Sequence, residues 1–592
     1  LALTDASLTN TGEGAYIRAN SLTANNLTEF SNSGKIAAQN LLSISSEETL
    51  NNQGELVANQ FTAVTQQDFI NQGLIQGNTQ LDINANSISN LADAEISKLG
   101  TASDLKLTAT GQLNNAGNIA SKGGLNVSAD ELLNSQNLTS SGTTTVSTNA
   151  LNNSGLIYGN NLTVGSHSQY VIQTRDGLRT ESEANAGGLV AANTLTLYTQ
   201  GLMNDVYRAE KINIESNTGL QLAGKIEAEK QANISAKNLT VNNTSAIYIG
   251  ESDEVSTLSI TNGLENNGDI TSNSALSLIA KDVINNAEIK TNKQLGIHTN
   301  TLTNTVDALI SAAEEISFSG SNETNLDQAT SLINQGEIVS DKTLSIRSNL
   351  ITNSGNLQAL ENIDITAQTL TNDKNIQSNK QLNIIANNIT NQAPAQLSSI
   401  EALTINAKDN NLADTLINSG IISSKDLSLA ATTLTNNTGA IIAAEKAGLT
   451  ATTINNIGTL YQLESETPNA AFNITAHSLS NTGTSAKVDV RNGLFNLNTL
   501  INQGLIRERQ ENAADSDQLL LTNINTLNNS GELILYSDLE LTDTSLTNNG
   551  ANAYIRANSL IADNPSEFSN SGKIAALHLL SLSSEETLSN QG

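Results

Sequence analysis

The chain has 592 residues, with 28 Lys and Arg against 58 Asp and Glu, so its formal net charge is −30. Such an acidic chain lacks the basic surface that binds phosphates, which argues against nucleic-acid binding. It contains no Cys, which excludes disulfides and Cys-based metal sites. It also has no run of about 18 apolar residues that could span a membrane.

A short motif recurs along the chain: Asn, any residue, Gly, any residue and then an apolar residue. Four consecutive copies begin at Asn334, Asn353, Asn372 and Asn391, a step of 19 residues, and degenerate copies keep the Asn but lose the Gly. We expect tight turns at these positions because Asn and Gly both tolerate the left-handed backbone conformation. The predicted turn positions are Asn32, Gly34, Asn52, Gly54, Asn71, Gly73, Asn334, Gly336, Asn353, Gly355, Asn418 and Gly420.

Between the turns, apolar residues alternate with polar ones, as in Leu344-x-Ile346, and this pair recurs at the same 19-residue step. Alternation in such short runs indicates strands with one buried face. One coil of short strands cannot cover its own apolar face, so neighbouring coils must stack with like residues on like. The pattern predicts an all-β fold, a parallel β-helix with 19–20 residues per coil, and the usual crossover handedness makes it right-handed.

The two ends of the chain are copies of each other. Residues 1–54 recur at 539–592, an offset of 538, and the copies differ at 13 of 54 positions. Neighbouring coils share far less, so this copy is a duplication distinct from the coil period. An offset of 538 residues corresponds to about 28 coils and on the order of 130 Å at ~4.8 Å per coil. We expect residues 1–592 to form one continuous shaft, a fragment of a longer tandem array.

The period breaks most clearly at residues 166–188. The strands Leu162-x-Val164 and Leu195-x-Leu197 look equivalent but lie 33 residues apart, which leaves about 14 extra residues. Tyr and Arg, which are favoured at binding hot spots, are enriched in and after this insertion. The candidate partner-binding residues are Tyr170, Arg175, Arg179, Tyr198, Tyr207 and Arg208. The alternative is a loop packed on the shaft. Smaller breaks occur near 320–330, 463–470 and 507–517.

The sequence offers no catalytic, metal or cofactor cluster. Acidic residues are scattered, and runs such as Glu47-Glu48 are typical of solvated turns. The four histidines have no His, Cys or paired acid at ligand spacing. We therefore expect a protein that is not an enzyme. A carbohydrate-active β-helix enzyme is a remote alternative, which would need two acids about 5–10 Å apart in a groove.

The Asn-x-Gly-x-Ile motif and the Leu-x-Ile pairs at a 19–20 residue step resemble the haemagglutinin repeats of filamentous-haemagglutinin-type exoproteins. These are large two-partner-secreted adhesins and contact-dependent growth-inhibition effectors of Gram-negative bacteria. The resemblance implies export through an outer-membrane two-partner-secretion transporter and a place on the bacterial cell surface.

Two functions follow from this resemblance. The first is a structural shaft that projects a distal adhesive or toxin module. The second is direct binding, through side loops such as 166–188, to a receptor on a host or neighbouring bacterial cell.

Overall fold

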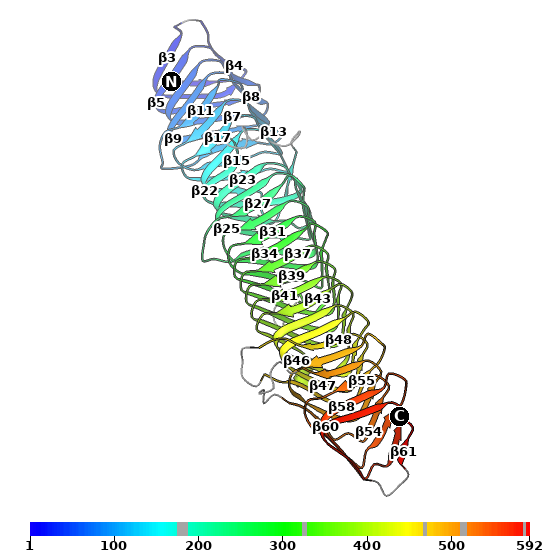
Figure 1. Ribbon diagram of the computed structural model, residues 1–592. Helices are drawn as coiled ribbons and strands as arrows, with labels where there is room; N and C mark the ends of the chain where they lie inside the picture. Colours follow the sequence, from blue (N-terminus) through cyan, green and yellow to red (C-terminus); the bar gives the residue numbers. More distant parts are fainter. Residues whose placement is uncertain (13, 175–186, 322–327, 466–469, 510–517, 584–587) are drawn as a thin grey trace. The chain divides into compact units, whose positions relative to one another are not determined.

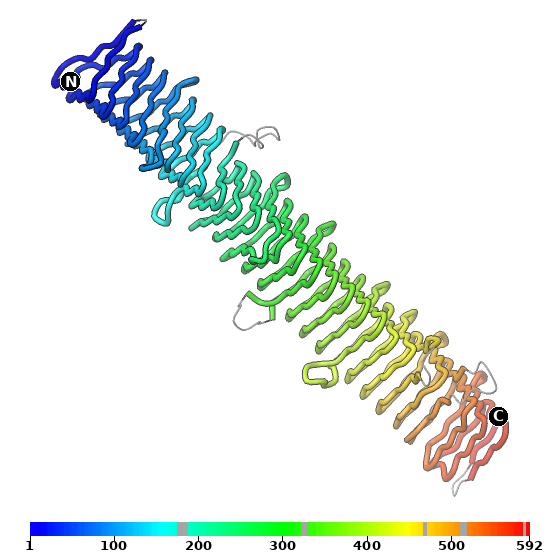
Figure 2. The backbone as a smooth tube through the Cα atoms, turned by 90° about the vertical axis from the view of Figure 1, so that its left-hand side faces the viewer, coloured from blue at the N-terminus to red at the C-terminus, as the bar shows by residue number. Residues whose placement is uncertain are grey.

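The computed structural model describes residues 1–12, 14–174, 187–321, 328–465, 470–509, 518–583 and 588–592. The chain divides into two compact units, unit 1 at Leu1–Lys293 and unit 2 at Gln294–Gly592. In each unit, short strands wind into coils that lie one against the next (Figures 1 and 2). The described residues form 61 strands and no α-helix, and the stacked coils of each unit are those of a β-solenoid, with about 28 turns in all. The predicted parallel β-helix is confirmed, whereas its right-handed sense stays a prediction.

Two successive coils of unit 2 show the repeating structure. Each combines a short strand with a long one: β37 (Glu337–Ser340) with β38 (Thr343–Asn353), then β39 (Asn356–Ala359) with β40 (Asn362–Asn372). β38 pairs with β40 in parallel along its length, each residue opposite the one 19 positions later. Each long strand continues around a bend, because the small buried residues there, Ser348 and Ala367, let the pairing continue.

The interior of each coil is filled by the alternating apolar residues. Leu344 and Ile346 of β38 are buried and lie beside Ile363 and Ile365 of β40. Stacked like residues exclude water from both faces of a coil that has a neighbour on each side, which is the main driving force for the fold.

The Asn of each motif is a core residue. In unit 2 the Asn353 amide Nδ2 donates to Asn372 Oδ1 at 2.8 Å and to the Asn375 carbonyl at 3.0 Å, while Asn353 Oδ1 accepts from Asn334 Nδ2 at 2.8 Å. Each buried amide is thus satisfied by the coils on either side. This Asn ladder of unit 2 comprises Asn304, Asn334, Asn353, Asn372, Asn391, Asn418, Asn436, Asn456, Asn481, Asn502, Asn529, Asn548, Asn570 and Asn590.

The expected reason for glycine at the turns is wrong. The predicted turn glycines, such as Gly54 and Gly355, are absent from the residues with positive φ. Instead, a Cβ atom on Gly355 would overlap the carbonyl oxygen of Gly336, and one on Gly54 would overlap that of Gly34. At these two positions glycine is favoured because the backbones of successive coils approach too closely for a side chain.

One departure from the period was not expected from the sequence. A 3₁₀ turn, η1 (Lys408–Asn410), lies between β44 (Ala402–Asn406) and β45 (Ala413–Asn418). Asp409 and Asn410 there have φ of 58° and 59°, a conformation that Asn and Asp adopt more readily than most residues. The expected breaks near 320–330, 463–470 and 507–517 fall partly on residues outside the described ranges.

Candidate binding groove

The insertion in unit 1 begins with a tight reversal of the chain. β20 (Leu156–Val164) is followed by Gly165, whose φ of 77° is easily reached only without a side chain. Ser166 and Gln169 then exchange two backbone hydrogen bonds of 2.9 Å. This reversal brings His167 and Tyr170 to the outer surface of the coils that follow.

His167 and Tyr170 meet two outward side chains of the stacked strands. Tyr198 belongs to β22 (Gly188–Met203) and Glu215 to β23 (Val206–Glu215), where the two residues lie side by side in register. Glu215 Oε1 accepts a hydrogen bond from the Tyr170 hydroxyl at 2.8 Å and lies 3.1 Å from His167 Nδ1. The Tyr198 hydroxyl lies 3.2 Å from His167 Nε2, so hydrogen bonds connect the whole cluster.

The electrostatics of the cluster favour the neutral phenol of Tyr170. Its hydrogen bond to Glu215, together with partial burial and the negative charge of that carboxylate, raises the pKa of Tyr170. The rings also pack edge to face, with centroids 4.6 Å apart for His167 and Tyr198 and 6.2 Å apart for Tyr170 and Tyr198. The insertion is therefore anchored by an aromatic and polar contact.

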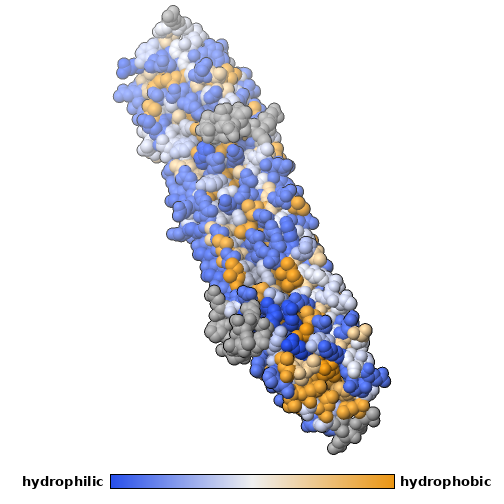
Figure 3. All heavy atoms as spheres, in the orientation of Figure 1, coloured by the Kyte–Doolittle hydropathy of each residue, from blue (hydrophilic) through white to orange (hydrophobic). Residues whose placement is uncertain are grey.

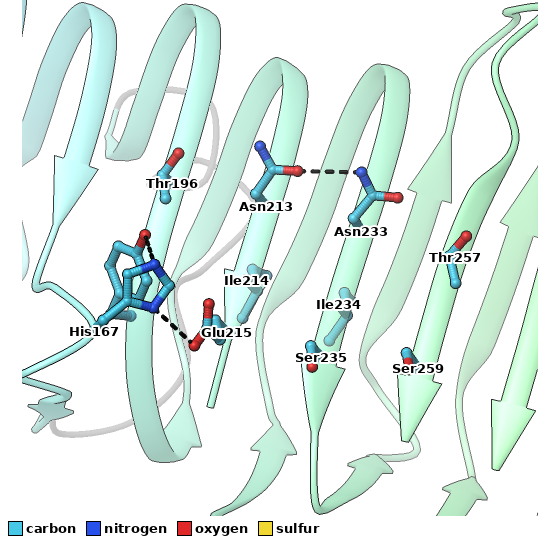
Figure 4. A pocket seen from close by; sticks show the side chains of 11 residues that line it. His167, Thr196, Asn213, Ile214, Glu215, Asn233, Ile234, Ser235, Thr257 and Ser259 are labelled. Carbon is cyan, nitrogen blue, oxygen red and sulfur yellow. Dashed lines mark hydrogen bonds and ion pairs between the residues drawn. The ribbon is translucent and has the colours of Figure 1, made fainter. Parts of the chain in front are cut away.

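The cluster forms one end of a surface groove of about 540 Å³. Figure 4 shows its lining as two rows of outward side chains, contributed by β22, β23, β25 (Lys225–Ala236) and β28 (Ser256–Asn266). One row contains Thr196, Asn213, Asn233 and Thr257, and the other contains Tyr198, Glu215, Ser235 and Ser259. Amides, hydroxyls and one aromatic wall suit a polar ligand. Glu215 is the one carboxylate among the described lining residues, whereas glycoside hydrolysis generally uses two.

The structure brings together only some of the predicted candidate residues. Tyr170 and Tyr198 lie in the cluster described above. Tyr207 is fully buried, and its hydroxyl donates to Gln173 Oε1, so it serves the core and does not face a partner. Arg208 is paired with Glu227 on the next coil through a 2.8 Å bond from Nε. Arg175 and Arg179 lie outside the described residues.

Sequence reasoning missed His167 and Glu215. They lie 48 positions apart, on different coils, and no local spacing connects them. The signal that could have found Glu215 is its place two residues beyond Asn213, in the outward row that also contains Tyr198.

A second cluster of charged residues lies in unit 2. The carboxylate of Asp489, only 1% exposed, contacts Lys487 Nζ at 2.5 Å and the Arg507 guanidinium at 2.6 Å. Arg509 lies 3.3 Å from it and packs 4.5 Å from the ring centre of Tyr461. Burial alone would raise the pKa of Asp489, but the hydrogen bonds and charges of Arg507 and Lys487 outweigh it, so the pKa lies below its usual value. Lys487 and Arg507 thus neutralise the buried carboxylate of Asp489.

The described residues contain no group of three or more His, Asp and Glu side chains that could hold a metal ion. Within the same ranges, no helix is long and apolar enough to cross a membrane.

Comparison with known proteins places the repeat in a family. No curated protein and no solved structure matches the chain. The family model of the haemagglutinin repeat, however, matches residues 17–117, 317–393, 402–507 and 473–592, which is more than half of the sequence. The unmatched stretch from 118 to 316 contains the groove. With its stacked coils and repeated Asn motif, this chain belongs to the haemagglutinin-repeat family.

Proposed function

We propose that this chain is the structural shaft of a large secreted surface filament that projects a distal binding or toxin module. The observation that carries the proposal is the uniform stacking of coils. β38 pairs with β40, and β40 with β42 (Gln381–Asn391), at the same 19-residue register and through the same ladder Asn, so each of these repeats adds the same rise. Such a design makes reach proportional to the number of coils.

The family membership and the composition support export to the cell surface. Haemagglutinin-repeat proteins are typically exported by a two-partner transporter of the outer membrane. A chain with no Cys passes an oxidising compartment without forming disulfides. Coils that need only their neighbours can fold one after another as they emerge. We therefore infer an outer-membrane transporter as partner and a place on the outside of the cell.

The copied ends support a tandem array. β3 (Tyr16–Leu27) and β5 (Lys35–Ser46) in unit 1 have counterparts in β58 (Tyr554–Asp563) and β60 (Lys573–Ser583) in unit 2. Both pairs are parallel and in the same register, since Tyr16 lies opposite Lys35 and Tyr554 opposite Lys573. Copies that fold alike would lengthen a shaft by equal steps.

The test is electron microscopy of the intact filament on cells, before and after deletion of one 538-residue repeat. A spacer predicts a filament shorter by roughly 130 Å, at ~4.8 Å per coil, with target binding or killing kept at closer range. Loss of function even when cells are forced into close contact would refute the spacer. A length change far from this value would refute one coil per repeat.

The groove favours a second candidate function, direct binding of a receptor on a host or neighbouring bacterial cell. Its Tyr198, Glu215 and Asn233 offer an aromatic face, an acid and amide groups within one concave surface. Deletion of residues 175–186 together with Tyr198→Ala should then abolish attachment without shortening the filament. Tyr248→Ala is the matched control, because Tyr248 is 44% exposed and lies outside the groove lining. Unchanged attachment by the deletion variant would leave the shaft as the sole role.

A further inference from the structure

Unit 2 has one surface with no charged side chain over twelve successive coils. It consists of the two outward positions one and three residues before each ladder Asn, from β33 (Thr301–Asn304) to β57 (Ser545–Asn548), and is named here the uncharged strip. Its 24 side chains are thirteen Thr, four Ser, three Asn, three Ile and one Leu, and all are at least partly exposed. Strand pairing keeps them in two straight columns, for example Thr369 beside Asn388 and Thr371 beside Thr390.

The absence of charge is particular to this surface. In unit 1 the corresponding positions contain acids on five coils, at Glu29, Asp68, Glu131, Glu265 and Asp282. Within unit 2 the short first strand of each coil, such as β37, also has an outward column, and this column contains Glu337, Lys487 and Glu532. A chain of net charge −30 therefore keeps one long strip free of both signs, although its visible surface is mostly hydrophilic (Figure 3).

The strip also exposes apolar side chains on three of its coils. Ile333 is 37% exposed, Leu350 44% and Ile417 36%, and hydroxyl and amide groups surround them. Thr415 donates to Asn388 Oδ1 at 2.8 Å across neighbouring coils, which shows that these groups can bond laterally without a charge. The strip combines apolar area that a partner could shield from water with neutral hydrogen-bonding groups, as protein–protein interfaces do.

We propose that the uncharged strip is where two copies of this chain pack side by side. Two acidic chains repel wherever their carboxylates face each other, and this strip is a surface where close approach opposes no like charges. A strip laid on a second copy of itself is self-complementary, as a two-fold contact requires.

The expected strength follows from the size of the strip. Twelve coils at ~4.8 Å span about 53 Å, and a width of about 10 Å gives roughly 500 Å² per chain, or about 1,000 Å² in total. This lies at the low end of specific interfaces, so the association is weak and depends on concentration. Side-by-side packing is a role beyond that of a spacer, because it would join neighbouring shafts into a bundle.

The test is sedimentation equilibrium of the 592-residue chain over a range of concentrations. We expect reversible dimers that strengthen when NaCl is raised from about 0.05 M to about 0.5 M, because salt screens the repulsion between the remaining acids. The pair Thr371→Asp and Thr435→Asp, which places charges within the strip, should raise the dissociation constant at least tenfold. The pair Gln358→Glu and Gln377→Glu adds the same charge on the first strand of the coil and should change it less than threefold.

Single cysteines provide a second readout in a chain that has none. Thr435→Cys should form a disulfide-linked dimer on mild oxidation, whereas Gln377→Cys should remain monomeric under the same conditions. Circular dichroism melting shows that each variant is folded. The proposal is overturned if the chain stays monomeric at every concentration and salt, if the strip and control pairs weaken association equally, or if both cysteines cross-link alike.

Discussion

The Asn ladder is continuous in unit 2 and broken in unit 1. In unit 2 it runs from Asn304 to Asn590, and each amide donates to the next. In unit 1 it runs from Asn10 to Asn153, where Asn153 Nδ2 donates to the buried carboxylate of Asp205 at 2.8 Å. The next three described coils place Met203, Leu222 and Val241 at the ladder position, and Asn returns at Asn266.

This difference shows that the residue at the ladder position must be compatible with the residues at that position in the neighbouring coils. A stack of Asn side chains is only one way to achieve this. Apolar residues stack on apolar ones in the interrupted stretch, as amides stack on amides elsewhere. The cost appears at the junction: Asn266 Oδ1 is buried without a hydrogen-bond partner, because Val241 precedes it and has no donor. The interruption coincides with the groove and with the stretch that the family model leaves unmatched. Regular coils build the support, and the irregular ones build the candidate site.

The substitution expected to destabilise the continuous ladder most is Asn353→Leu. Leu has a similar volume but would leave Asn334 Nδ2 and Asn372 Oδ1 facing an apolar side chain inside the core. Two buried groups at about 1–3 kcal/mol each predict a loss of about 4 kcal/mol. Hydrogen–deuterium exchange should show faster exchange in the coils from 334 to 391. Ser354→Ala, on the exposed turn beside it, should leave the exchange unchanged.

Glycines in the two stretches should respond for different reasons. Gly355→Ala places a methyl group against the Gly336 carbonyl and should cost about 3 kcal/mol, the range of overpacked sites. Gly201, in the interrupted stretch, has open space around its Cα but a φ of 75°. Gly201→Ala should therefore cost only about 1 kcal/mol, from backbone strain. Local exchange rates measure both, and equal effects would contradict the close-approach explanation.

Restoring Asn to the interrupted stretch should depend on the coil chosen. Leu222→Asn would isolate an amide between Met203 and Val241 and should cost about 2–3 kcal/mol. Val241→Asn would instead donate to the unpartnered Asn266 Oδ1 and extend the ladder, so its cost should be lower by about 1–2 kcal/mol. The double variant should be less destabilised than Leu222→Asn alone. Additive effects in local exchange would contradict pairing between the new amides.

Much of the fold could be predicted because its information is periodic. The 19-residue step alone places Leu344 beside Ile363 and Asn353 beside Asn372. The role of glycine could not be inferred in the same way, since the distance between coil backbones is a property of the stack. The continuation of β38 around the bend at Ser348 could not be inferred for the same reason.

The candidate site was less predictable because it depends on a departure from the period. Enrichment of Tyr pointed to Tyr170 and Tyr198, and both lie in the cluster. The same criterion selected Tyr207, but side chains alternate between the two faces of a strand, and that of Tyr207 points into the core. His167 contacts Glu215 only because Gly165 and the reversal after it direct the chain back over later coils. The periodic pattern of one sequence does not predict the direction that the chain takes after Gly165.

The buried acid of unit 2 gives the mildest test, because cations rather than amides hold it. The folded pKa of Asp489 lies below its usual value, so Lys487 and Arg507 stabilise the fold fully at neutral pH. This contribution should persist down to about pH 4, the ordinary pKa of Asp, and should be lost as the pH falls further, through the folded pKa. Asp489→Asn should destabilise the surrounding coils at pH 7, and its difference from the unaltered chain should shrink below about pH 4. Gln377→Ala, on β41 (Asn375–Ser378), removes no charge and should show no such pH dependence in the same exchange measurement. A difference between Asp489→Asn and the unaltered chain that stayed constant with pH would mean that packing, and not charge, is what Asp489 provides.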